Sequence, residues 1–103
     1  MTLSASDKKQ YRTIAHNLNP IIMIGDKGLT EGLMIELNRA LHDHELIKVK
    51  IAIGDRGDRK KITEELLYKT GSELIQNIGK IAVLLKRNSK PHPKLSNLLR
   101  TQH

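Results

Sequence analysis

The chain contains no cysteine, no phenylalanine and no tryptophan, and its only aromatic side chains besides histidine are two tyrosines. The absence of cysteine excludes disulfides, cysteine-based zinc sites and thiol catalysis. The absence of large aromatics means that the core has to be built from aliphatic side chains. It also argues against base stacking as the main way of recognising nucleic acid, so a nucleic-acid partner would be a structured RNA read by shape and phosphate position.

The sequence also lacks any apolar run close to the roughly 20 residues that cross a membrane. Its first residues have neither the basic region nor the apolar region of a signal peptide. We therefore expect a cytoplasmic protein without a membrane partner. A length of 103 residues leaves room for one domain with one core.

Acidic residues are missing from the C-terminal stretch, residues 86–103, which carries five of the 18 lysines and arginines. The rest of the chain is nearly balanced, with 13 basic and 11 acidic residues, although the net charge is +7. This distribution predicts a polyanionic partner that is bound in a salt-dependent way. The alternative is a solvated stretch that only aids solubility. Because Pro91 and Pro93 interrupt regular structure, we predict a flexible basic tail over residues 88–103, after a domain of residues 1–87.

Hydrophobic periodicity predicts an α/β domain of the two-layer α+β type, with the order α-β-α-β-α-β-β. The predicted elements are helices over residues 4–18, 30–45 and 55–70 and strands over residues 21–24, 46–53, 73–78 and 81–86. We expect a mixed four-stranded sheet with the second and third helices on one face. The first strand is apolar throughout, which predicts a central position in the sheet. In the third helix, Leu66 and Tyr68 are both expected to face the core.

A glycine loop, Gly25-Asp26-Lys27-Gly28, separates the first strand from the second helix. Glycine adopts positive φ without strain and allows another backbone to approach closely. Thr30 can cap the helix that follows, whose free N–H groups favour a phosphate. We interpret these residues as an RNA-backbone site to which Lys27 adds a charge. The alternative is an ordinary strand-to-helix turn that needs two glycines.

Two further groups of basic residues are candidates for phosphate contacts. Lys48 and Lys50 alternate with apolar residues on the second strand, so both point to one face of the sheet. The second group lies near the start of the third helix, where cations oppose the helix dipole and so do not serve helix stability. This group consists of Arg56, Arg59, Lys60 and Lys61. In both cases the alternative is a solvated basic surface.

Catalysis is the weakest hypothesis that the residues allow. A small nuclease or hydrolase would use His16, His42 or His44 together with Asp43 or Asp55, but no spacing of a nucleophile and a base supports it. His42 and His44 have no third metal ligand at a set spacing. We therefore expect no enzyme activity, no metal, no cofactor and no small-molecule substrate.

Several of these blocks, in this order, resemble the small bacterial YhbY-type proteins, the single-domain form of the CRM domain (chloroplast RNA splicing and ribosome maturation). The resemblance covers residues 3–87. It rests on residues 14–16, on the glycine loop with Leu29-Thr30-Glu31-Gly32, on residues 44–50, on Asp55-Arg56 and on Thr70-Gly71. The sequence departs from the usual pattern at Gly57 and in its longer basic C-terminal stretch.

The resemblance implies a fold similar to the C-terminal domain of bacterial translation initiation factor three. It also implies a monomeric RNA-binding protein that associates with precursors of the large ribosomal subunit, with Gly25, Asp26, Lys27 and Gly28 contacting RNA. The competing expectation is an adaptor that binds ribosomal or other proteins without specific RNA contact. Such an adaptor would bind RNA no more tightly than any weakly basic protein does.

Overall fold

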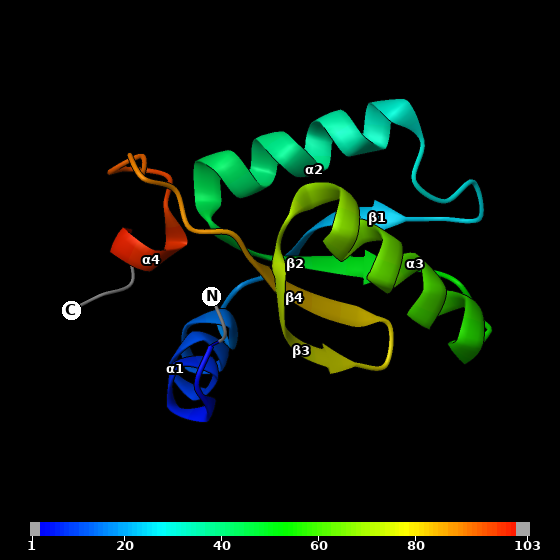
Figure 1. The fold of residues 1–103 in the computed structure, drawn as a ribbon, viewed down its shortest axis with the longest axis horizontal. Coiled ribbons are helices and arrows are strands. Elements are labelled where there is room, and N and C mark those ends of the chain that lie inside the picture. Colours follow the sequence, from blue (N-terminus) through cyan, green and yellow to red (C-terminus); the bar gives the residue numbers. More distant parts are fainter. Residues whose placement is uncertain (1–2, 101–103) are drawn as a thin grey trace.

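A computed structural model describes residues 3–100 of the chain (Figure 1). Its elements follow the predicted order, and a short additional helix lies near the C-terminus. The helices are α1 (Ala5–Ala15), α2 (Glu31–His44), α3 (Arg56–Thr70) and α4 (Asn97–Arg100), and the strands are β1 (Pro20–Ile24), β2 (Leu46–Ile51), β3 (Glu73–Ile78) and β4 (Ile81–Leu85). The predicted α+β class is confirmed.

The four strands form one mixed sheet in the order β1-β2-β4-β3. β1 runs parallel to β2, whereas β4 runs antiparallel to both of its neighbours, β2 and β3. The mixed sheet was predicted, but the central position of the first strand was wrong, because β1 is an edge strand. Ile22 and Ile24 are buried, whereas Ile21 and Met23 are exposed on the other face. An apolar strand is buried on both sides only when both faces of its sheet are covered, and here one face of the sheet is partly open.

Local capping explains where the long helices begin and end. The Thr30 hydroxyl accepts a hydrogen bond from the Leu33 amide (3.2 Å), and the Asp55 carboxylate accepts one from the Asp58 amide (2.9 Å). α3 ends at Gly71, which has a φ of 69° in the left-handed region that glycine tolerates. The sequence therefore fixes the ends of α2 and α3 through neighbouring residues.

Replacing Asp55 with alanine is expected to destabilise the protein by about 1 kcal/mol, because an amide in the first turn of α3 loses its acceptor. The measurement is urea unfolding followed by circular dichroism. Asp58→Ala is the matched control, since it removes a carboxylate from the same turn but keeps the cap. Equal losses in the two variants would show that charge near the helix start, and not the cap, is responsible.

The main core lies between the sheet and the layer formed by α2 and α3, as predicted (Figure 1). It is aliphatic, and its buried side chains include Ile24, Leu37, Val49 and Leu66. The prediction that Tyr68 faces this core is wrong, since its side chain is 89% exposed. Positions 66 and 68 are separated by about 200° around a helix, so burial of Leu66 turns Tyr68 outward.

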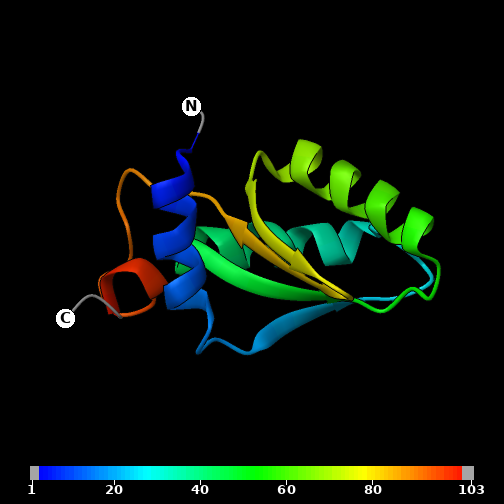
Figure 2. The same cartoon turned by 90° about the horizontal axis from the view of Figure 1, so that it is seen from below.

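A second, smaller core lies on the opposite face of the sheet, beneath α1 and the C-terminal segment. Ala15 is buried there, and Tyr11, Ile14 and Leu18 pack against the cluster, as their helical spacing predicts. Figure 2 shows that α1 crosses one end of this face and leaves the other end open. This face is therefore only half covered.

The predicted flexible tail is corrected by the structure, because residues 88–100 pack against the fold. Ser96 and Leu98 are buried, and the Ser96 hydroxyl donates to a Glu45 carboxylate oxygen (2.6 Å). The Asn97 side-chain amide donates to the carbonyl oxygen of Leu46 (2.6 Å). The sequence of this segment has no helical or strand periodicity from which its order could be predicted. Polar contacts with distant residues hold it in place instead. Residues 101–103 of the predicted tail lie outside the described residues.

Candidate nucleic-acid interface

Three chain connections meet at one end of the sheet, which we call the loop end. They are the β1–α2 loop, the β2–α3 turn and the β3–β4 hairpin (Figure 1). The Ala52 amide donates to the Ile24 carbonyl oxygen (2.8 Å), and the Ile51 amide donates to the Lys80 carbonyl oxygen (2.7 Å). These backbone bonds extend past the last paired residues of the strands and hold the three connections together.

The glycine loop forms a closed turn at this end. The Gly28 amide donates to the Gly25 carbonyl oxygen (2.9 Å), and the Gly28 carbonyl accepts from the Thr30 amide (3.1 Å). Gly28 has a φ of +68°, and a Cβ at this position would lie 3.5 Å from Cδ1 of Ile62 in α3. The turn therefore needs a glycine at Gly28 and packs against α3. Asp26 and Lys27 are exposed at the tip of the loop.

The four basic residues at the start of α3 differ in what they can offer a ligand. The guanidinium of Arg59 donates to the carbonyl oxygens of Ile53 and Gly54, both at 2.8 Å, so it fixes the β2–α3 turn. Arg56, Lys60 and Lys61 have exposed side chains. A ligand at the loop end would therefore meet the cations of these three residues and Lys27, with Arg59 mainly holding the backbone.

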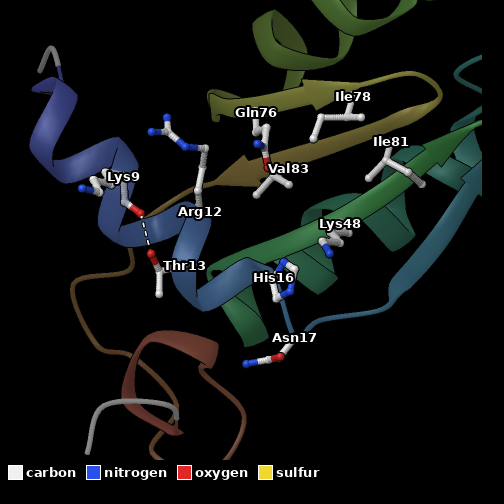
Figure 3. Close-up of a pocket in the computed structure, with 10 residues that line it drawn as sticks. All are labelled: Lys9, Arg12, Thr13, His16, Asn17, Lys48, Gln76, Ile78, Ile81 and Val83. Atoms are coloured by element: carbon white, nitrogen blue, oxygen red, sulfur yellow. Dashed lines mark hydrogen bonds between the residues drawn. The ribbon is translucent and has the colours of Figure 1, made fainter.

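Lys48 and Lys50 lie on the opposite face of the sheet from α2 and α3. Lys48 lines a groove of about 720 Å³ between α1 and the strands, which we call the α1–sheet groove. Lys9 and Arg12 of α1, with His16 directly after the helix, form one wall of this groove (Figure 3). The sequence does not show where the first helix docks, so it does not place Lys9 and Arg12 beside the sheet. The groove was therefore missed.

Two of the three histidines that a catalytic hypothesis requires have other partners, and the third, His16, lines the α1–sheet groove together with no acidic residue. Nδ1 of His42 lies 3.2 Å from the Asn88 side-chain nitrogen, and Nδ1 of His44 lies 2.8 Å from the Leu95 carbonyl oxygen. Within residues 3–100 there is no group of three or more histidine, aspartate or glutamate side chains that could hold a metal ion. Among the same residues, no helix is both long and apolar enough to cross a membrane.

Comparison with known proteins shows the family to which the chain belongs. The model of the CRS1/YhbY (CRM) domain matches residues 3–86. A protein of Pseudomonas aeruginosa named as a probable RNA-binding protein is 47% identical over 100 residues, which cover 97% of this chain and 96% of that protein. An RNA-binding protein of Haemophilus influenzae is 44% identical over 85 residues, or 82% of this chain and 86% of the relative.

A solved structure shows the same fold. The solution structure of a Staphylococcus aureus protein, described as a candidate RNA-binding protein, superimposes with a TM-score of 0.75 at 34% sequence identity. The match covers 86% of this chain and 93% of the Staphylococcus protein.

Proposed function

Since the chain belongs to the CRS1/YhbY (CRM) domain family, we propose that it is a non-catalytic RNA-binding protein that acts in assembly of the large ribosomal subunit. The names of two bacterial relatives, which describe RNA binding, support the first part of this proposal. The second part rests on the resemblance to YhbY-type proteins.

The observation that carries the proposal is the convergence of the glycine loop and the start of α3 at the loop end. The Gly28 turn lies against Ile62 of α3, so Lys27 and the exposed cations of α3 lie at the same end of the fold. The amides at the start of α2 and the basic side chains would contact RNA phosphates. A structured RNA holds its phosphates at fixed positions, so protein groups can recognise it by its shape.

Seven of the eleven predicted site residues have a distinct part in this proposal. Thr30 and Gly28 hold the loop and the start of α2, while Arg59 holds the turn before α3. Direct phosphate contacts are assigned to the remaining cations of the loop end. These are Lys27, Arg56, Lys60 and Lys61.

The proposal is tested by sedimentation of the tagged protein from a cell lysate on a sucrose gradient. We expect co-migration with precursors of the large subunit, and loss of this co-migration in Lys27→Glu. Lys69→Glu is the matched control, because Lys69 is an exposed lysine at the other end of α3.

Wild-type protein that stays at the top of the gradient at low salt would contradict a role in subunit assembly and favour the adaptor. If Lys27→Glu still co-migrates, the ribosomal precursor is a partner, but the contact lies outside the glycine loop.

A further inference from the structure

The open half of the sheet carries a row of side chains that crosses all four strands and is apolar except at Lys50. Met23 pairs with Lys50, Lys50 with Ile81, and Ile81 with Ile78. Met23 is 63% exposed and Ile78 is 64% exposed, although both are large apolar side chains. Exposed apolar surface surrounded by polar groups is typical of a binding site.

The next row along the sheet continues this surface into the α1–sheet groove. Lys48 pairs with Val83, and Val83 pairs with Gln76. Figure 3 shows these side chains opposite Arg12 of α1 and His16, which directly follows α1. The groove thus has an aliphatic floor and a basic rim, and none of the residues that line it is acidic.

The basic side chains of this surface extend along the sheet toward the loop end. Lys48 and Lys50 are two residues apart on one strand, so they project from the same face about 7 Å apart. Lys50 pairs with Met23, and β1 ends one residue later, directly before the glycine loop. Basic side chains therefore run from α1, across β2, to Lys27.

We propose that the α1–sheet groove binds an unpaired RNA strand that continues from the structured RNA held at the loop end. This inference rests on the proposed function and extends its footprint to a second face. Lys9, Arg12, Lys48 and Lys50 contact the phosphates, and the aliphatic floor contacts the bases. Because these contacts go to phosphates and to aliphatic side chains, and phosphate contacts carry no sequence information, the groove takes a strand with little preference for its sequence.

The test compares an RNA hairpin with a blunt end and the same hairpin with eight unpaired uridines added to its 5′ or 3′ side. Binding is measured by fluorescence anisotropy at several salt concentrations. One of the two extensions is expected to tighten binding by wild-type protein about tenfold and to increase the salt dependence.

Lys9→Gln combined with Arg12→Gln is expected to abolish the gain from the extension and to leave binding of the blunt hairpin within about twofold. Lys90→Gln combined with Lys94→Gln is the matched control, because it removes two exposed cations from the C-terminal segment. Ile78→Thr is expected to reduce the gain without changing the salt dependence, since it alters only the floor.

Failure of this inference can be told apart from failure of the proposed function. Loss of blunt-hairpin binding in Lys27→Glu reports on the loop end, whereas the gain from the extension reports on the groove. The inference is overturned if neither extension improves binding, or if the gain survives Lys9→Gln with Arg12→Gln. Groove-dependent binding of a peptide of alternating glutamate and leucine, with no gain from the extensions, would overturn it in favour of a protein partner.

Discussion

Replacing Lys27, Lys60 and Lys61 together with glutamate is expected to weaken binding of a structured RNA by a hundredfold or more at low salt. The three lysines are exposed at the loop end, where the glycine loop packs against α3. Each phosphate contact that is lost should lower the slope of log affinity against log salt by about one. The triple variant should therefore also show a slope lower by about two to three.

The matched control replaces Lys69, Lys90 and Lys94 with glutamate. These lysines are also exposed, and both triple variants lower the net charge of +7 by the same six units. A loss of RNA affinity confined to the first variant would locate the RNA contact at the loop end. Equal losses in the two variants would show that only total charge matters. Urea unfolding of both variants checks that each is folded, since Lys69→Glu removes the ion pair between Lys69 and Glu65.

Replacing Glu45 with alanine is expected to destabilise the protein by about 3 kcal/mol and to release residues 88–100. Glu45 is only 3% exposed. Its two carboxylate oxygens accept hydrogen bonds from the Ser96 hydroxyl (2.6 Å) and from the backbone amide of Asn88 (2.7 Å). Without the carboxylate, the buried Ser96 hydroxyl loses this partner. Urea unfolding measures the loss, and amide hydrogen exchange shows whether the segment opens.

Glu45→Gly provides the control for the backbone at this position. Glu45 has a φ of 62° and a ψ of −45°, the only positive φ among the non-glycine residues that the structure describes. Glycine also removes the carboxylate but relieves this strain, so Glu45→Gly should be more stable than Glu45→Ala by about 1–2 kcal/mol. Stability of Glu45→Ala within 0.5 kcal/mol of wild type would contradict a role for Glu45 in holding the segment.

Much of the fold could be predicted because its signals are local. Thr30 and Asp55 cap helices through amides three residues away, and Gly71 ends α3 by its own backbone conformation. The alternation of Lys48 with Val49 gives β2 its two faces. The glycine loop was found in the same way, since its turn closes between Gly25 and Gly28.

The candidate site was predicted less completely, because its second part depends on how a helix docks. Lys9 and Arg12 lie on the helix predicted over residues 4–18, and Lys48 lies on the strand predicted over residues 46–53. No pattern in the sequence places these three residues together. Arg59 shows the reverse case, in which a cation that was expected at the interface mainly fixes the turn between β2 and α3.

The sequence by itself determined the elements, their caps and the glycine loop, because each depends on residues within one or two turns of one another. The tertiary structure alone decided that β1 lies at the edge, that α1 builds one wall of a groove, and that residues 88–100 are held by Glu45 and Leu46. The bonds from Ser96 to Glu45 and from Asn97 to Leu46 join residues 51 positions apart. No periodicity within a local window reports such contacts, since they exist only once the sheet brings distant parts of the chain together.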